Sequence, residues 1–313
     1  MHVLVTGGLG FLGRAVTRDL LASGHRVTVI SRGRGDRHPP RDVTIVTGDI
    51  RDRARVAQIV EEGGYDGVVH LAALTSGRDS FADPLSYFDV NEIGTLNLLM
   101  ALDAERTTAA PPAMVFASTN IVYGSQHHGA LSEDLPPHPE NPYAASKVAA
   151  ENMVAAYAAT GAIGAIIVRP FNIAGAVDGV TDTDRTRIIP NIFRAITGQL
   201  DHVTLNGDGL AVRDFVHVAD VATAIRQSLA ACAPGACSTI NLGSGTGTRM
   251  AAVVATAEQI TGHPVTVHRQ PPKPEPPNLI ANISRAQALL RWAPTRSKLT
   301  DILSDAWNAW PTR

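Results

Sequence analysis

The chain has 313 residues, of which 44% are hydrophobic and 18% are charged, and its formal net charge is -2 at pH 7. This length suits one large α/β domain, or a nucleotide-binding domain with a smaller lobe. The near-neutral charge argues against binding to nucleic acid or to an anionic membrane surface. No apolar run approaches the ~18 residues of a membrane span. No basic segment precedes an apolar one at the N-terminus, so we expect neither a membrane segment nor a signal peptide.

The two cysteines, Cys232 and Cys237, are expected to be free thiols near a helix end. A zinc site needs about four ligands, and no cysteine or histidine cluster supplies them. Two cysteines in a chain of this length fit a reducing, cytoplasmic compartment. The chain has 3 lysines and 24 arginines, so a well-placed lysine carries more weight than a well-placed arginine.

Strand-like and helix-like segments alternate over residues 1–170. The hydrophobic periodicity predicts strands at 2–6, 26–30, 43–46, 67–71, 113–117 and 165–168, and helices at 11–22, 56–62, 84–105 and 142–160. Asp83-Pro84 and Asn141-Pro142 each place a cap residue before a proline at the first helical position. This alternation predicts an α/β fold, a Rossmann-type doubly wound parallel sheet with helices on both faces.

After Pro170 the pattern loosens, and glycines, prolines and short mixed segments dominate. Helices are predicted at 188–198, 218–231, 249–260 and 298–308, and five prolines within 271–277 predict a loop. We therefore expect residues 1–170 to form a dinucleotide-binding Rossmann domain. Most of 171–313 is expected to form a smaller C-terminal α/β substrate lobe, although such lobes often return a strand to the main sheet.

A glycine loop lies between the first predicted strand and the first predicted helix. Gly7, Gly10 and Gly13 have the spacing GxxGxxG, with Phe11 and Leu12 between the last two. The first glycine permits a tight turn, the second lets the backbone approach a pyrophosphate, and the third lets helix pack on strand. The helix N-terminus offers N–H groups to the phosphates. A glycine triplet alone could arise by chance among 27 glycines, but this position predicts a dinucleotide site.

The end of the second strand normally distinguishes NAD from NADP. A carboxylate there binds the adenosine ribose, whereas a nearby arginine suits a 2′-phosphate. This chain has Ser31 and Arg32 and no carboxylate, which favours NADP over NAD. The alternative is that Arg32 is one of many arginines and that Ser31 bonds a ribose hydroxyl.

Two further strand ends carry candidate cofactor contacts. Asp49 and Ile50 follow the third strand, where a carboxylate can meet the adenine amino group; a solvated loop aspartate is the alternative. Leu71, Ala72 and Ala73 end the fourth strand, and their small size would let a cofactor lie against the strand tip. A buried strand end would explain the same residues.

Tyr143 and Lys147 are the most informative pair in the sequence. The spacing i, i+4 places both on one face of the helix that begins at Pro142. Removing a hydride from a carbinol carbon requires a base for the hydroxyl proton, and a free phenol with a pKa of ~10 is a poor base at neutral pH. A nearby ammonium and an oxidised nicotinamide would stabilise the phenolate and lower that pKa. The alternative is a surface tyrosine beside a solvated lysine.

Ser118 and Thr119 end the fifth predicted strand. A hydroxyl at a strand tip beside the nicotinamide could bond the substrate oxygen and stabilise charge that develops there. A capping or turn role is the alternative.

These motifs, in this order, resemble the extended short-chain dehydrogenase/reductases, in particular the NAD(P)-dependent nucleotide-sugar epimerase/dehydratase group. The likeness extends over almost the full length. It includes Asn91 within VNEIGTLNLL, the segment RPFN ending at Asn172, the segment GDG beginning at Gly207, the segment VRDFVHV beginning at Val212, and LLRWAP ending at Pro294.

The resemblance implies roles for individual residues. It makes Tyr143 the base, Lys147 the residue that orients the ribose and tunes Tyr143, and Thr119 the hydroxyl beside the substrate. It adds Asn91 and Ser118 to the cofactor site. It assigns the substrate, a nucleotide-diphosphate sugar of the UDP or dTDP type, to a set of residues in the second lobe: Asn172 and Arg213 at the diphosphate, Thr204 and Asn206 near the base, and also Ile188 and Lys273. It further implies a homodimer joined through the helices at 84–105 and 142–160.

Three departures from the family pattern bear on function. Ser31 stands where NAD-dependent members carry aspartate, so the choice between NAD and NADP is open. Residues 273–275 read Lys-Pro-Glu where many members have Arg-Gly-Asp or Arg-Gly-Glu. The residues after Thr119 lack the Asp-Glu pair with which sugar 4,6-dehydratases expel water.

We therefore expect a nucleotide-sugar epimerase, acting at C4 by transient oxidation to a keto-sugar. An NADPH-dependent reductase of a keto-sugar nucleotide is the alternative, favoured by Ser31 and Arg32. A 4,6-dehydratase and a non-catalytic dinucleotide-binding protein rank lower, the latter because Tyr143, Lys147 and Thr119 are all present.

Overall fold

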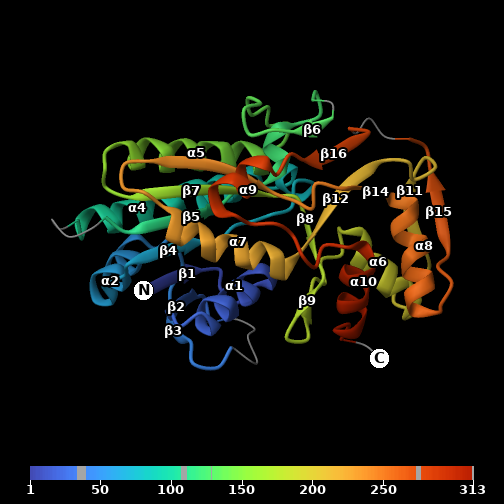
Figure 1. The fold of residues 1–313 in the computed structure, drawn as a ribbon, viewed down its shortest axis with the longest axis horizontal. Coiled ribbons are helices and arrows are strands. Elements are labelled where there is room, and N and C mark those ends of the chain that lie inside the picture. Colours follow the sequence, from blue (N-terminus) through green and yellow to red (C-terminus); the bar gives the residue numbers. More distant parts are fainter. Residues whose placement is uncertain (34–39, 107–110, 128, 273–275, 312–313) are drawn as a thin grey trace.

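A seven-stranded, wholly parallel sheet forms the centre of the molecule (Figure 1). The computed structural model describes residues 1–33, 40–106, 111–127, 129–272 and 276–311. The strand order is β3-β2-β1-β4-β5-β7-β13, with β1 (His2–Thr6), β2 (Arg26–Ser31), β3 (Thr44–Thr47), β4 (Gly67–His70), β5 (Ala113–Ala117), β7 (Gly164–Pro170) and β13 (Cys237–Leu242). Every residue of β4 and β7 is buried, as expected of strands covered on both faces. The predicted Rossmann-type fold is confirmed.

Helices cover both faces of this sheet. On one face lie α1 (Phe11–Ala22) and α7 (Val218–Ala231), which share a core with β1, β2 and β13. On the other lie α2 (Arg53–Gly63), α4 (Gly94–Ala104) and α5 (Pro142–Ala159), which share a core with β4, β5 and β7. The predicted start signal of α5 is confirmed, because Asn141 Oδ1 accepts a hydrogen bond of 2.9 Å from the Ala144 N–H.

The helix predicted at 84–105 is not a single α-helix. It consists of α3 (Pro84–Phe88), a π-helical turn (Asp89–Ile93) and α4. A π turn inserts one residue into the helix and rotates the segment that follows. The sequence periodicity does not show this insertion.

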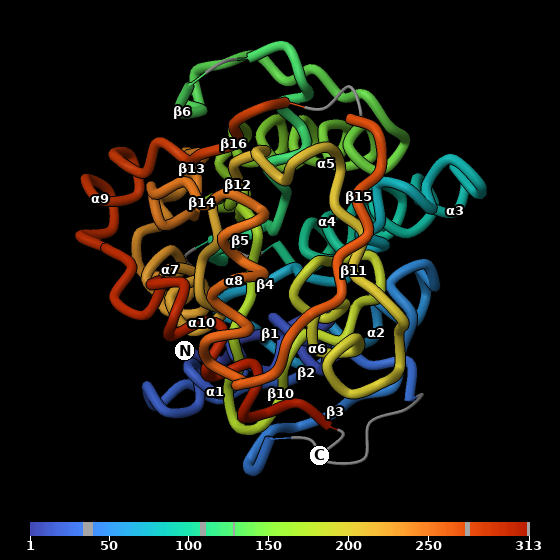
Figure 2. The backbone as a smooth tube through the Cα atoms, turned by 90° about the vertical axis from the view of Figure 1, so that its right-hand side faces the viewer, coloured from blue at the N-terminus to red at the C-terminus, as the bar shows by residue number. Residues whose placement is uncertain are grey.

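The C-terminal half forms a second body and also returns to the main sheet (Figure 2). Its helices α6 (Ile188–Ile196), α8 (Met250–Thr261) and α10 (Leu299–Asn308) enclose a separate core. Its strands are β8 (Asn172–Ala174), β9 (Ala176–Val177), β10 (Val180–Thr181), β11 (Val203–Asn206), β12 (Val212–His217), β14 (Gly247–Arg249), β15 (Val267–Gln270) and β16 (Asn278–Ala281). The short strand β6 (Ala130–Leu131), from the first half of the chain, pairs with β16. Three elements of this half pack with the central sheet: α7, α9 (Ser284–Leu290) and β13, which is its edge strand.

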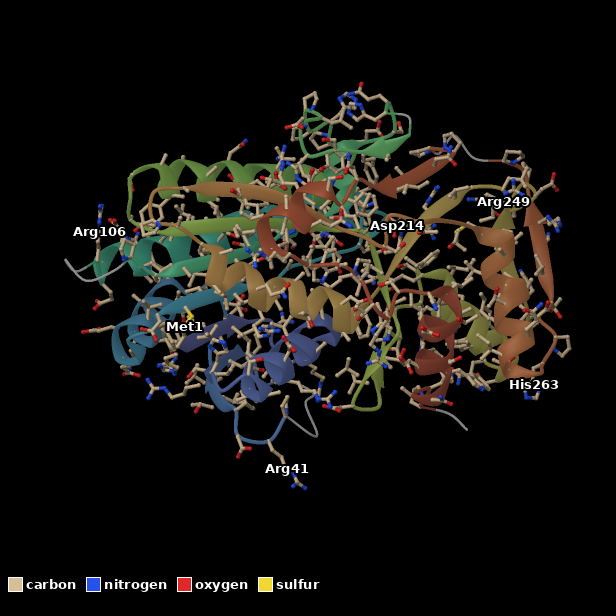
Figure 3. All side chains as sticks on the ribbon, in the orientation of Figure 1. Met1, Arg41, Arg106, Asp214, Arg249 and His263 are labelled. Carbon is tan, nitrogen blue, oxygen red and sulfur yellow. The ribbon has the colours of Figure 1, made fainter. Side chains whose placement is uncertain are left out.

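Asp214 on β12 joins the second body to the loop that follows β13 of the central sheet (Figure 3). It is fully buried, and its carboxylate accepts hydrogen bonds from the N–H groups of Ser244, Gly245 and Ala281 at 2.7, 3.0 and 3.1 Å. Burial raises the pKa of Asp214, while these hydrogen bonds act in the opposite direction. The carboxylate therefore fixes the loop after β13 and the end of β16 against β12.

Cys232 and Cys237 are free thiols, as predicted. Within the described part of the chain, no group of three His, Cys, Asp or Glu side chains is arranged to hold a metal ion. Each helix among the described residues is too short or not apolar enough to cross a membrane.

Candidate active site

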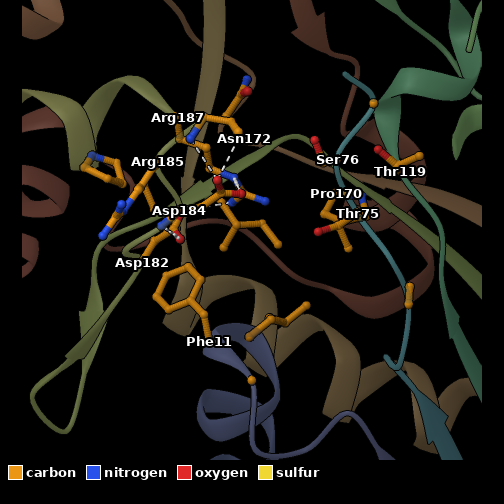
Figure 4. A pocket seen from close by; sticks show the side chains of 18 of the residues that line it. Phe11, Thr75, Ser76, Thr119, Pro170, Asn172, Asp182, Asp184, Arg185 and Arg187 are labelled. Atoms are coloured by element: carbon orange, nitrogen blue, oxygen red, sulfur yellow. Dashed lines mark hydrogen bonds and ion pairs between the residues drawn. The ribbon is translucent and has the colours of Figure 1, made fainter. Parts of the chain in front are cut away.

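A cavity of about 1440 Å³ lies at the carboxyl ends of the central strands and extends to the second body (Figure 4). A pocket for one small ligand holds roughly 300–1,000 Å³, so this cavity has room for a dinucleotide and a second ligand. The predicted site residues that line it are Gly7, Gly10, Phe11, Leu12, Gly13, Ser31, Arg32, Asp49, Ile50, Leu71, Ala72, Ala73, Ser118, Thr119, Tyr143, Lys147, Asn172, Ile188, Thr204, Asn206 and Arg213. Folding therefore gathers most of the predicted site in one place.

Two predicted site residues are not placed there. Asn91, predicted to contact the cofactor, lies in the π turn and is 1% exposed. Its side chain accepts from the Leu74 N–H at 2.8 Å and donates to the Leu74 carbonyl and to Ser146 Oγ, both at 3.0 Å. These bonds occupy its amide group, so Asn91 holds the loop after β4 against α5 and does not line the cavity. Lys273 lies outside the described residues.

The glycine loop has the shape that a dinucleotide requires. Gly7 has φ +70°, and a Cβ there would lie 2.8 Å from the Ala72 nitrogen. A Cβ on Gly13 would lie 2.0 Å from the Gly7 carbonyl oxygen, so only glycine lets α1 start this close to β1. A Cβ on Gly10 would meet only the Gly7 oxygen, at 3.4 Å, which leaves open space above the start of α1. The N–H groups of the first helical turn point into this space, as pyrophosphate binding requires.

Gly13 and Gly10 should therefore respond differently to alanine. Gly13→Ala forces backbone apart and is expected to lower the free energy of unfolding by at least about 2 kcal/mol. Gly10→Ala is expected to keep the stability within about 1 kcal/mol and to remove bound cofactor, since its methyl group enters the phosphate space. Thermal unfolding and the dinucleotide content of each purified variant measure both effects. Equal destabilisation by the two substitutions would contradict this assignment.

At the adenosine end of the cavity, Asp49 is bound by a neighbouring arginine. Arg51 donates to its carboxylate from Nη2 at 2.7 Å and from Nε at 3.0 Å. These hydrogen bonds are the main reason that the pKa of Asp49 falls to about 2; the charge of Arg32 contributes too. Ser31 Oγ accepts from the Gly33 N–H at 3.3 Å. Asp49 is thus a fixed anion on the wall of the cavity.

His70 aligns the strand tips below the cavity. It is 1% exposed, and its ring nitrogens hydrogen-bond with Thr6 Oγ1 at 2.6 Å and Thr95 Oγ1 at 3.0 Å. Burial, and secondly the charge of Lys147, lower the pKa of His70 to about 3. The imidazole is therefore neutral at physiological pH and links β1, β4 and α4.

Tyr143 and Lys147 are buried, with 5% and 1% exposure, and the predicted pair on one face of α5 is present. Lys147 Nζ lies 4.0 Å from the centroid of the Phe116 ring on β5. Burial lowers the pKa of Lys147 to about 7, while the charge of Glu151 acts to raise it. A surface tyrosine beside a solvated lysine is thereby excluded.

The sequence predicts that Lys147 and an oxidised nicotinamide together lower the pKa of Tyr143, and the protein without a cofactor provides only the first of these two charges. In the protein alone burial raises this pKa, whereas hydrogen bonding with Thr119 and the charge of Arg187 act to lower it. Taking the phenolate out of water outweighs these neighbours. Lowering the pKa towards neutrality therefore requires a further positive charge in the cavity.

The two hydroxyls at the tip of β5 have different surroundings. Thr119 Oγ1 accepts from the Ile121 N–H at 3.3 Å, the capping contact that the sequence left open, and it also hydrogen-bonds with Tyr143. Ser118 is 5% exposed, and its Oγ has no hydrogen-bond partner among the described residues. A buried hydroxyl without a partner is rare, and one that lines a cavity indicates a ligand there.

The opposite wall belongs to the second body. Asn172 Nδ2 donates to the Asp214 carbonyl at 2.8 Å, and Arg213 Nη1 donates to the carbonyls of Val212 and Pro276 at 2.9 and 3.0 Å. Both side chains are thereby held at the cavity rim. The wall continues through Thr204 on β11.

Sequence reasoning missed the charged segment just before α6. Figure 4 shows Asp182, Asp184, Arg185 and Arg187 together on one side of the cavity, with Thr119 across from them. Arg187 pairs with Asp182 at 3.1 Å and with Asp184 at 3.5 Å, and its charge acts on Tyr143. Among 24 arginines nothing in the sequence singles it out, because only folding brings it to the site.

Comparison with known proteins identifies the class. Residues 3–243 match the model of the NAD dependent epimerase/dehydratase family. The UDP-glucose 4-epimerase of Corynebacterium glutamicum is 34% identical, over 98% of this chain and 95% of its own length. The chain therefore belongs to this family, and the predicted enzyme class is confirmed.

Solved structures of UDP-glucose 4-epimerases superimpose closely on this chain. The UDP-glucose 4-epimerase of Stenotrophomonas maltophila, with bound NAD and formylated UDP-arabinopyranose, superimposes with a TM-score of 0.91 at 31% identity, covering 99% of this chain and 97% of that one. That of Bifidobacterium longum, in complex with NAD+ and UDP, gives 0.89 at 27% identity, covering 99% and 98%.

Proposed function

We propose that this chain is an NAD-dependent 4-epimerase of a UDP-hexose, which oxidises the sugar transiently at C4 and reduces it again from the other face. The observation that carries the proposal is that Tyr143, Lys147 and Thr119 line the same cavity as the glycine loop. The relatives supply the nature of the ligands, because their structures contain NAD and UDP or a UDP-linked sugar.

The chain's own residues would handle the proton. Bound NAD would take a hydride from C4 and return it. As the C4–H bond breaks with its electron pair, the 4-hydroxyl proton moves to the Tyr143 phenolate oxygen, and C4 becomes a ketone; the proton and the hydride later return, the hydride to the opposite face. Thr119 would hydrogen-bond the same sugar oxygen. The charge of Lys147 would stabilise the phenolate. No net oxidation occurs, so the cofactor stays bound between turnovers.

We propose NAD as the cofactor, in place of the NADP that Ser31 and Arg32 favoured in the sequence. The family description names NAD, and the solved relatives contain it. The Asp49 carboxylate supports the same choice: it remains charged down to a pH of about 2 and would repel a 2′-phosphate drawn by Arg32.

The cofactor released by denaturing the purified protein tests this function. Close to one NAD per chain is the expected result, because an epimerase regenerates its cofactor in each cycle. A protein that is isolated empty, binds NADPH and oxidises it with a keto-sugar nucleotide would instead be the reductase.

We further propose that residues 1–170 hold the cofactor, that most of 171–313 holds the sugar nucleotide, including Lys273, and that the enzyme works in the cytoplasm as a homodimer. The free thiols support a reducing compartment. Exposed apolar side chains on and beside α3, the π turn and α4 support the dimer: Phe81 (67%), Leu85 (77%), Ile93 (42%) and Leu96 (37%). Such a concentration of exposed large apolar side chains indicates an interface.

Leu85→Arg tests the dimer. A buried charge without a partner is strongly unfavourable in an interface, so we expect the variant to elute at half the mass of the wild type in light scattering, with its fold intact. Leu289→Arg on α9, also an exposed leucine (39%), is the control and should leave the mass unchanged. A wild-type chain that is monomeric at micromolar concentration would contradict the proposal.

A further inference from the structure

Three charged side chains are buried together behind the catalytic pair. Lys147 is 1% exposed, Arg169 4% and Glu151 5%. Glu151 lies one helical turn after Lys147 on α5, and Arg169 lies on β7. Arg169 donates to Glu151 from Nε at 2.9 Å and from Nη2 at 2.6 Å. A two-bond pair of this kind holds the carboxylate in one orientation.

Glu151 is the one negative group that acts on Lys147 among the described residues. On β4, His70 is neutral, because its pKa is about 3. On β5, the Phe116 ring lies 4.0 Å from Nζ. On α5 itself, Tyr143 is protonated in the protein alone, since burial raises its pKa. The ring attracts the ammonium through its quadrupole but carries no net charge, so the buried ammonium depends on Glu151 for its counter-charge.

Arg169 holds the Glu151 carboxylate in place beside α5. Its guanidinium also lies over the Tyr123 ring, 4.9 Å from the centroid, and Tyr123 donates to Asn241 Oδ1 at 2.7 Å. These contacts anchor Arg169 to β13 independently of α5. The carboxylate is thus fixed from the sheet side.

We propose that Glu151 is a positioning residue whose carboxylate, fixed by Arg169, keeps the buried Lys147 in its ammonium form and so makes Tyr143 an effective base. Since Lys147 changes its charge near pH 7, the loss of one negative neighbour converts it to the neutral amine at the working pH. The proposal rests on the proposed function for the part that Lys147 plays.

The charge of Lys147 can be read directly, because the chain has only 3 lysines. Lysine labelled with 13C at Cε gives three resonances, and Lys273→Arg and Lys298→Arg identify the other two. The labelled protein with its native cofactor is titrated from pH 5 to pH 10, without substrate. We expect Glu151→Gln to lower the midpoint of Lys147 by at least about 1 pH unit. Glu133→Gln is the control; it removes another buried carboxylate, 3% exposed, and should leave the midpoint unchanged.

An unchanged midpoint in Glu151→Gln would overturn the proposal, whatever the activity. The titration needs no substrate, so this failure is separate from failure of the proposed epimerisation. If Glu151→Gln does not fold, the double variant Glu151→Gln/Arg169→Gln removes both buried charges together. The midpoint should fall in it too, by less than in Glu151→Gln because the positive charge of Arg169 is also removed, and an unchanged midpoint there overturns the proposal equally.

The pH dependence of the kinetics is a second measurement, and it would not shift if Glu151 had a structural role alone. In Glu151→Gln the basic limb of the kcat/KM profile, which reports the enzyme without substrate, should shift to lower pH by the same amount as the midpoint. Glu151→Asp keeps the charge and should restore most of the profile. A uniform loss of kcat at every pH would instead assign Glu151 to folding alone.

Discussion

Tyr143→Phe is expected to lower kcat about 10³-fold, within the range typical of a lost general base. The ring stays in place, packed edge-on against Tyr87 with centroids 6.1 Å apart, and only the hydroxyl that takes the proton is lost. The free energy of unfolding should change by no more than about 1 kcal/mol. Bound cofactor should remain, since the glycine loop is untouched. Turnover of UDP-glucose, thermal unfolding and cofactor content measure the three effects.

Tyr157→Phe is the matched control for this prediction. Tyr157 lies on the same helix, and its hydroxyl donates to Asp103 at 3.1 Å, away from the cavity. Its removal should leave kcat within about twofold. If Tyr143→Phe kept more than a tenth of the wild-type kcat, Tyr143 could not be the base.

Lys147→Met is expected to make the protein more stable and nearly inactive. Burial lowers the pKa of Lys147 from 10.5 to about 7, so the folded state binds this proton more weakly than the unfolded chain. The penalty is fully present below pH 7 and disappears as the pH rises towards 10.5. At about 1.4 kcal/mol per pKa unit, methionine should raise the free energy of unfolding at pH 6 by a few kcal/mol.

The pH dependence identifies the cause. Unfolding in urea at pH 6 and at pH 10 should show a large gain for Lys147→Met at pH 6 and little gain at pH 10, whereas kcat falls at least about 100-fold. Lys298→Met, at an exposed lysine, should change stability by less than about 0.5 kcal/mol at either pH. A loss of stability in Lys147→Met at pH 6 would contradict the buried-ammonium account.

The parts of this site that are local in sequence could be predicted. The glycine loop, the capped start of α5 and the pair Tyr143 and Lys147 depend on spacings of a few residues, which a helix or a turn converts directly into geometry. Six of the seven central strands are short runs bounded by turns, so their places in the chain and their parallel arrangement could be predicted; β13 (Cys237–Leu242) was not located in the sequence.

The remaining parts depend on contacts between distant segments. Glu151 and Arg169 pair across α5 and β7, and Arg187 reaches Tyr143 from the second body. Asn91 was given a cofactor role by family resemblance, but the π turn directs its amide to Leu74 and Ser146. No periodicity in the sequence encodes an inserted helical residue or a pairing between two such segments.

The most direct test of the central claim follows the hydrogen at C4. UDP-glucose carrying deuterium at C4 is incubated with the purified enzyme, without added cofactor, and the sugar is analysed by NMR. The account predicts a mixture of the two C4 epimers with the deuterium retained in both, because the enzyme-bound cofactor takes the hydride and returns it to the same molecule. An absence of the C4 epimer, or conversion only while added NADPH is consumed, would contradict it.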